Sequence, residues 1–215
     1  MRSWKFIALV AAGFVSAGVA IGAVVAAHQS TRPAALPSGP PAGSYRGSKP
    51  PPGIRAPDFR LRSYRGGDVQ MRDLKGKVVV VTFLDTACRD KCPIIASLMG
   101  AGMHRLTPGE RAQVEALAIS VLPQVDTPVR VRRFLQQRHA LGALDWLIGP
   151  VPDLLKVWKA FSVLAASDTG NANVHSATVR IFDRSGVWVS TLHVGEDLTP
   201  ANFAHDVRVA LHARP

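Results

Sequence analysis

The stretch that decides the fold is residues 77–106, KVVVVTFLDTACRDKCPIIASLMGAGMHRL. Its first part, KVVVVTFL at residues 77–84, is β-branched and apolar on both faces, which predicts a strand buried in the middle of a sheet. Its last part, residues 93–106, opens with proline and carries apolar side chains at helical spacing, which predicts a helix. Cys88 and Cys92, the two cysteines of the chain, lie where the strand passes into the helix.

Beyond this stretch the pattern alternates between strands and helices. The predicted elements are a short hairpin around residues 66–67, a strand at 114–121, a helix begun by Asp126 or Thr127 and Pro128, a strand near DWLI, a helix near PDLLKVWKAF, a hairpin of TVRIFD and VWVSTLHV, and a helix from about Thr199 to His212. This order predicts a thioredoxin-like α/β fold, with a mixed central sheet flanked by helices. In that fold the cysteines stand at the carboxyl end of a central strand, where α/β sheets bind ligands.

Residues 1–27 predict a signal-anchor, that is, an N-terminal transmembrane helix. Arg2 and Lys5 precede an uncharged run, residues 6–27, which as a helix is about 33 Å long and crosses a hydrocarbon core of about 30 Å. A cleaved signal peptide has a shorter apolar region of about 7–15 residues, although Val25-Ala26-Ala27 would serve as its cleavage site. The positive charges before the run predict a cytoplasmic N-terminus and a chain that crosses the membrane once.

The rest of the chain divides by composition into two parts. Residues 28–56 are rich in Pro, Gly and Ser, so they predict a flexible linker. Residues 57–215 are enough for one domain that buries about 70% of its unfolded surface. The net charge of +11 could favour an acidic partner or anionic lipid headgroups, or reflect an ordinary arginine-rich surface. Because the basic residues are dispersed, without aromatic interleaving, we expect no nucleic-acid binding.

The cysteine pair has three candidate roles. A structural disulfide would close a loop of only about five residues and stabilise the fold by about 2 kcal/mol, which is a small gain for a domain of this size. In the first turn of a helix, Cys88 and Cys92 lie on one face, close enough for a disulfide to form and break. The helix N-terminus should also lower their thiol pKa values. Thiol–disulfide exchange and capture of a soft metal therefore both remain open.

His175 is the candidate third metal ligand. It stands in NANVHSATVRIFDRSG, before the last hairpin, in a loop that a thioredoxin-like fold packs beside the cysteine helix. Two thiolates and an imidazole suit Cu(I), and hold Cu(II) with a further ligand or water, whereas structural zinc wants four closed ligands. A lone histidine near a strand is more often a surface or hydrogen-bonded residue, so spacing alone makes His175 only a candidate. Asp85 could tune the cysteine pKa values, or bond nearby backbone as strand-end residues do.

These residues resemble the Sco/SenC family, membrane-anchored thioredoxin-like copper chaperones for cytochrome c oxidase. The resemblance covers about Pro57 to Val207. It is carried by LKGKVVVVTF, Cys88-x-x-x-Cys92-Pro93 with Asp90 between the cysteines, SVLPQVDTP at residues 120–128, His175-Ser176, and Asp183-x-x-Gly186. Arg89, Leu122 and Val174 depart from the proline and the two aspartates that are common at these positions in the family.

The resemblance implies that Cys88, Cys92 and His175 bind copper, as Cu(I) or Cu(II), and that the chain delivers it to the copper A centre of cytochrome c oxidase subunit two. Some relatives instead reduce the cysteines of that subunit. The alternative is therefore a metal-independent thiol–disulfide oxidoreductase, with Cys88 and Cys92 as its redox-active disulfide and a periplasmic target, and whether the protein is an enzyme stays open. Either role implies a single-pass protein of the bacterial inner membrane whose domain faces the periplasm.

Overall fold

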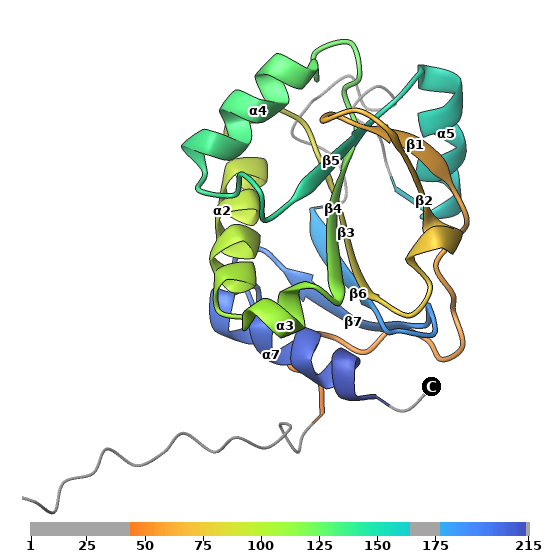
Figure 1. Ribbon diagram of the computed structural model, residues 1–215, viewed down its shortest axis with the longest axis vertical. Coiled ribbons are helices and arrows are strands. Elements are labelled where there is room, and N and C mark those ends of the chain that lie inside the picture. The colour runs from red at the N-terminus through yellow and green to blue at the C-terminus, as the bar shows by residue number, and fades with distance from the viewer. Residues whose placement is uncertain (1–43, 164–176, 214–215) are drawn as a thin grey trace, which may run out of the picture. The chain divides into compact units, whose positions relative to one another are not determined.

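The computed structural model describes residues 44–163 and 177–213. Within these ranges, seven strands form one mixed sheet in the order β2-β1-β5-β4-β3-β6-β7 (Figure 1). The strands are β1 (Arg60–Ser63), β2 (Asp68–Gln70), β3 (Val78–Leu84), β4 (Val114–Ser120), β5 (Asp145–Ile148), β6 (Thr178–Phe182) and β7 (Trp188–His193). β3, β4 and β5 are parallel, and the other pairs are antiparallel. The predicted mixed sheet is confirmed, and it includes both predicted hairpins.

The helices follow the predicted order. They are the 3-10 helix η1 (Met71–Leu74) and the α-helices α2 (Lys91–His104), α3 (Pro108–Arg111), α4 (Pro128–Gln137), α5 (Val151–Ala160) and α7 (Pro200–His212). The short η1 and α3 were not predicted. α3, α4 and α7 each start at a Thr-Pro pair, in which the threonine hydroxyl accepts a hydrogen bond from a backbone N–H of the first turn. For α4 this makes Thr127, rather than Asp126, the N-cap.

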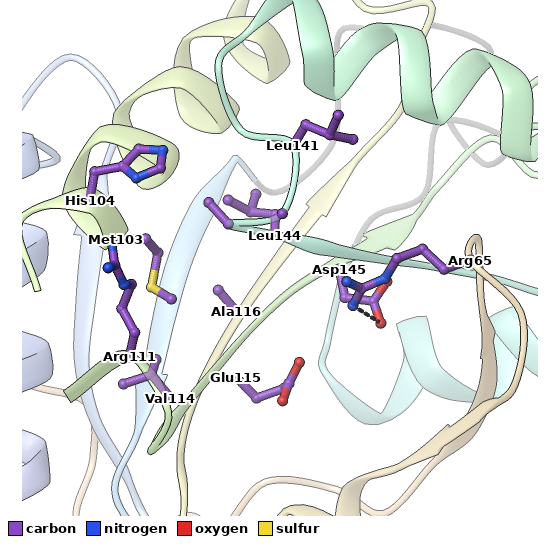
Figure 2. A pocket seen from close by; sticks show the side chains of 12 residues that line it. Arg65, Met103, His104, Arg111, Val114, Glu115, Ala116, Leu141, Leu144 and Asp145 are labelled. Atoms are coloured by element: carbon purple, nitrogen blue, oxygen red, sulfur yellow. Dashed lines mark ion pairs between the residues drawn. The ribbon is translucent and has the colours of Figure 1, made fainter. Parts of the chain in front are cut away.

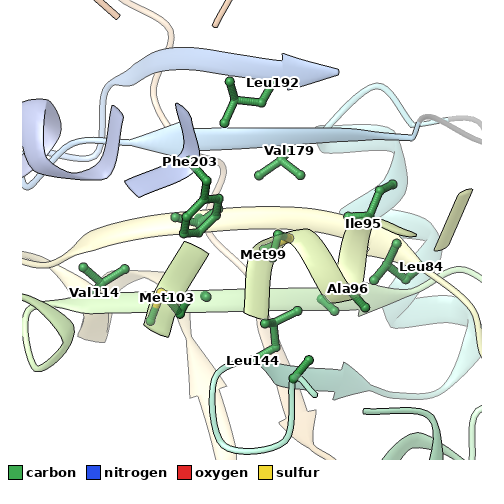
Figure 3. Close-up of a cluster of buried hydrophobic side chains, with 14 of the residues drawn as sticks. Leu84, Ile95, Ala96, Met99, Met103, Val114, Leu144, Val179, Leu192 and Phe203 are labelled. Carbon is green, nitrogen blue, oxygen red and sulfur yellow. The ribbon is translucent and has the colours of Figure 1, made fainter. Parts of the chain in front are cut away.

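β3 is an interior strand of the sheet, paired with β4 and β6, and it contributes side chains to both hydrophobic cores. All seven of its residues are buried, as the unbroken apolar run predicts. Because successive side chains point to opposite faces, Val78, Val80 and Leu84 pack in the core with α2, α4 and α7, whereas Val79, Val81 and Phe83 pack in the core with α5. Figure 3 shows the first of these cores, where α2 lies over β3. The helices therefore cover both faces of the sheet (Figure 1).

α2 and α7 pack closely because a glycine stands between them. A Cβ atom on Gly102 of α2 would lie 2.4 Å from Cδ1 of Phe203, a fully buried ring of α7. That ring lies beside α2 among the core side chains of Figure 3. The contact sets how closely the C-terminal half of α2 approaches α7.

The last part of the segment assigned by composition to the linker packs on the domain. Backbone N–H groups of Arg46 and Gly47 donate to the carboxylate of Asp206, at 2.8 and 3.0 Å. Further along, Ser48 bridges to Thr191 and Arg55 to Val187, both in antiparallel fashion. Asp206 is fully buried, so its charge requires such donors. Part of the segment 46–56 therefore belongs to the folded domain.

The predicted membrane segment, residues 1–27, lies outside the described residues. Among the helices at 44–163 and 177–213, none combines the length and the apolar character that crossing a membrane requires.

Candidate metal centre

The two cysteines flank the start of α2. The helix begins at Lys91, so Cys92 lies in its first turn, whereas Cys88 lies in the loop that follows β3. The prediction that both cysteines belong to the first helical turn is therefore wrong for Cys88. The backbone N–H of Cys92 donates to Sγ of Cys88, at 3.4 Å. The sulfur of Cys88 thus takes one of the N–H groups that a helix N-terminus leaves without an intrahelical acceptor.

Three side chains that can bind a metal meet at this point. Each of Asp85, Cys88 and Cys92 offers a ligand atom, and these atoms all lie within 4.8 Å of one another. Cys88 is 6% exposed, and the other two are fully buried. Both cysteines are thiols. The described residues thus place two soft donors and one hard donor in a buried site at the carboxyl end of β3.

Asp85 holds the loop that presents Cys88. Its Oδ1 accepts the backbone N–H groups of Ala87 and Cys88, at 2.9 and 2.6 Å. An aspartate that bonds N–H groups two and three residues ahead forms a tight local turn. The prediction that Asp85 bonds nearby backbone is confirmed, and its consequence is that the backbone position of Cys88 is set by this carboxylate.

Asp126 holds the same loop from another part of the chain. Its Oδ1 accepts the N–H and the hydroxyl of Thr86, at 2.8 and 2.7 Å, and its Oδ2 accepts the hydroxyl of Ser120, at 2.6 Å. Burial raises the pKa of the Asp126 carboxyl, although the hydrogen bonds from Ser120 and Thr86 oppose that rise. The sequence suggested Asp126 only as a helix cap, because the partner Thr86 is 40 residues away.

The pKa of the Cys92 thiol is raised well above its ordinary value of 9.0. The largest cause is the hydrogen bond with Cys88, the next is burial, and the negative charges of Cys88 and Asp85 act in the same direction. A backbone hydrogen bond from Asp85 opposes this rise without cancelling it. The lowering predicted from the helix N-terminus is therefore wrong for Cys92. A metal that binds Cys92 must displace its proton.

His175 lies outside the described residues. The chain is described again from Ala177, directly before β6. β6 runs antiparallel beside β3, and the hydroxyl of Thr82, near the end of β3, donates to the carbonyl of Thr178 at 3.0 Å. β6 therefore begins beside the carboxyl end of β3, which is the end that leads to the cysteines.

Two other histidines among the described residues have acidic partners. Nδ1 of His193 lies 3.7 Å from Oδ1 of Asp197, and Nδ1 of His205 lies 2.9 Å from Oδ1 of Asp206. Neither histidine belongs to a group of three or more potential ligands among the described residues.

A cavity of about 350 Å³ lies at the other end of the parallel strands. Its wall includes residues 114–116, the start of β4, whereas Cys88 follows the end of β3, and β3 and β4 pair in parallel register. Figure 2 shows the guanidinium of Arg65 beside Asp145 in this cavity, a pair 3.2 Å apart. The cavity is therefore separate from the cysteine site.

Comparisons with known proteins agree on one family. The family model described as SCO1/SenC matches residues 48–212. Among solved structures, ScoI of Bradyrhizobium japonicum with copper bound is 28% identical, with a TM-score of 0.60 over 74% of this chain and 100% of that chain. Yeast Sco1 is 20% identical, with a TM-score of 0.61 over 77% and 99%.

A third solved structure is that of BsSco, described as having a disulfide switch and as a member of the Sco family of cytochrome c oxidase assembly proteins. It is 21% identical, with a TM-score of 0.64 over 78% of this chain and 99% of that chain. No curated protein sequence matches the chain. These likenesses confirm the thioredoxin-like fold of the Sco proteins. Because the family model spans most of the sequence, the chain belongs to the SCO1/SenC family.

Proposed function

We propose that this protein is a copper-binding chaperone, tethered to a membrane, that delivers copper to the copper A centre of cytochrome c oxidase subunit two. Copper is the cargo in this proposal. The observation that carries it is the pair of buried cysteine sulfurs within 4.8 Å of each other, in a family member whose solved relatives include one with copper bound. Soft thiolates favour Cu(I), and a mixed donor set also holds Cu(II).

The proposed ligands are Cys88, Cys92 and His175. Support for His175 comes from the sequence pattern and from the direction of β6, whose first residue, Thr178, hydrogen-bonds to the end of β3. A residue three positions upstream of Thr178 is within a short chain length of that edge, since three residues span at most about 10 Å. Three ligands leave a soft metal with open coordination positions, which suits transfer to another protein.

The proposed location is the bacterial inner membrane, with one crossing and the domain in the periplasm. It rests on the uncharged run at residues 6–27 and on the two basic residues that precede it. A tether of this kind would hold the copper site near a membrane-bound target.

Copper titration of the full chain in mild detergent tests the three-ligand site. We expect wild type to bind one equivalent, with sulfur-to-copper charge-transfer absorption for Cu(II). His175→Ala should weaken binding at least tenfold and change the spectrum. His193→Ala is the matched control, because His193 is near the sheet end but pairs with Asp197, and it should bind as wild type does. Equal affinity and an unchanged spectrum for His175→Ala would contradict the site.

The second candidate function is thiol–disulfide exchange without metal. It is favoured by the contact between the two cysteines, in which the Cys92 N–H donates to the Cys88 sulfur. In this reaction one thiolate attacks the disulfide of the target, and the other then releases the reduced target by closing the Cys88–Cys92 disulfide. Turnover on a disulfide substrate that survives His175→Ala, in a chain that binds no copper, would favour this function over the first.

A further inference from the structure

A buried carboxylate shares the site with the two sulfurs. Asp85 offers an oxygen within 4.8 Å of the ligand atoms of Cys88 and Cys92, and all three residues are buried. Its Oδ1 accepts two backbone N–H groups, those of Ala87 and Cys88, which hold the carboxylate in one orientation. Because an ionised carboxylate has about four lone-pair positions, it can bind a metal ion while it also accepts hydrogen bonds.

The chemistry of this oxygen differs from that of the sulfurs. Thiolates are soft and suit Cu(I), whereas carboxylate oxygens are hard and suit more highly charged ions. The charge balance in the buried site points the same way. Two thiolates and one carboxylate carry three negative charges, which leave a net charge of −2 with Cu(I) and −1 with Cu(II). Because buried net charge is costly, the carboxylate penalises the reduced ion more than the oxidised one.

We infer that Asp85 is an additional metal ligand of this site and that it makes the site favour Cu(II) over Cu(I) relative to the same site without that carboxylate. This inference rests on the proposed copper-binding function. It assigns to Asp85 a role separate from holding the loop, since loop holding alone would affect both oxidation states of copper equally.

The test compares Asp85→Asn with wild type, as full chains in mild detergent without oxygen. The asparagine amide oxygen can still accept the N–H groups of Ala87 and Cys88, but it carries no charge and is a weaker ligand. Cu(I) and Cu(II) affinities are measured separately by competition with chelators. Co(II) serves as a probe that thiolates do not reduce, with its visible bands reporting the donor set.

We expect Asp85→Asn to weaken Cu(II) and Co(II) binding at least tenfold and to shift the Co(II) bands, while Cu(I) affinity changes less than threefold. A tenfold loss of Cu(II) affinity at unchanged Cu(I) affinity raises the reduction potential of the bound copper by about 59 mV. Asp85→Ser, whose hydroxyl can also accept a backbone N–H, should behave in the same way if the Asn variant folds poorly.

Asp126→Asn is the matched control, because Asp126 is a buried carboxylate that holds the same loop through Thr86 but lies outside the group of potential ligands. Its ratio of Cu(I) to Cu(II) affinity should stay within threefold of wild type. Equal losses for both copper ions in Asp85→Asn would reduce Asp85 to a positioning residue and overturn the inference. If wild type binds copper and Asp85→Asn binds both copper ions and Co(II) as wild type does, the inference alone is overturned. If wild type binds neither copper nor Co(II), the proposed function is overturned as well.

Discussion

Buried carboxylates hold this molecule together at the level of single residues. Asp85, Asp126 and Asp206 are at most 2% exposed, and each accepts at least two N–H or O–H groups. A buried charge without such donors is strongly unfavourable, and charge-assisted hydrogen bonds are among the stronger ones. Each of these side chains therefore fixes the segment of backbone that supplies its donors. Two of these segments belong to the cysteine loop, and the third is the chain around residue 46.

Tyr45, next to that third segment, should make stability depend on alkaline pH. Burial raises its pKa from 10.0 to about 12, and the charges of Asp183 and Asp206 add to the rise. The folded state thus prefers the neutral phenol, so this contribution is complete below about pH 10 and is lost as the pH rises toward 12. Between pH 9 and pH 11.5, we expect the free energy of unfolding to fall by about 1 kcal/mol more for wild type than for Tyr45→Phe. This figure is reduced because Tyr45 is partly exposed.

Urea unfolding of both chains at the two pH values measures that difference. An absorbance titration of the phenolate should also show one midpoint near pH 12 that is missing from Tyr45→Phe. If the two chains lost stability in parallel, the environment assigned to Tyr45 would be incorrect.

At the level of elements, the starts of helices depend on neighbouring residues, whereas the packing between helices depends on residues far apart in the sequence. A Thr-Pro pair starts α3, α4 and α7, so these starts can be read from neighbouring residues. The packing of α2 on α7 instead depends on a contact between Gly102 and Phe203, residues about a hundred positions apart. No local pattern marks Gly102 as different from the other glycine in the middle of α2. Gly102 has no room for a side chain, because the Phe203 ring lies against it.

Gly102→Ala should therefore destabilise the protein. Alanine is intrinsically better than glycine in a helix by about 1 kcal/mol, but its Cβ would lie 2.4 Å from the Phe203 ring. Overpacking of a buried contact costs about 1–3 kcal/mol, so we expect a net loss of about 1–2 kcal/mol in urea unfolding. Gly109→Ala is the control, because nothing lies within 4 Å of its added Cβ, and it should be neutral or slightly stabilising. A Gly102→Ala protein as stable as this control would contradict the close packing.

At the level of the whole molecule, the parallel sheet gathers the site. β3 and β4 end in register, with Leu84 opposite Ser120, so the residues that follow the two strands meet at one edge. Asp85 and the cysteines follow β3, and Asp126 follows β4. The last part of the composition-defined linker, in contrast, joins the domain through Asp206 and Thr191. The fold therefore begins before residue 57, in agreement with a family match that starts at residue 48.

Truncation should locate this boundary. A chain that starts at residue 57 removes both N–H donors of Asp206, and each buried acceptor that loses a donor costs about 1–3 kcal/mol. We expect it to be less stable by about 2–4 kcal/mol than a chain that starts at residue 44, as measured by urea unfolding. In the shorter chain, Asp206→Asn should recover part of the loss, because it removes a buried charge whose contacts are reduced to the Ser190 hydroxyl and His205. Equal stability of the two truncated chains would show that residues 44–56 add nothing to the fold.

The sequence by itself determined the order of strands and helices and the position of the cysteines between the central strand and α2. These features depend on neighbouring residues: an unbroken apolar run for β3, Thr-Pro pairs at helix starts, and glycines in turns. The predicted site was incomplete because its other members come together only in the folded chain. Asp126 reaches Thr86 across 40 residues. The rise in the Cys92 pKa comes from the hydrogen bond with Cys88 and from burial, whereas the helix N-terminus by itself predicts a lower pKa. The tertiary structure alone decided these points, since burial and long-range hydrogen bonds depend on which distant segments pack together.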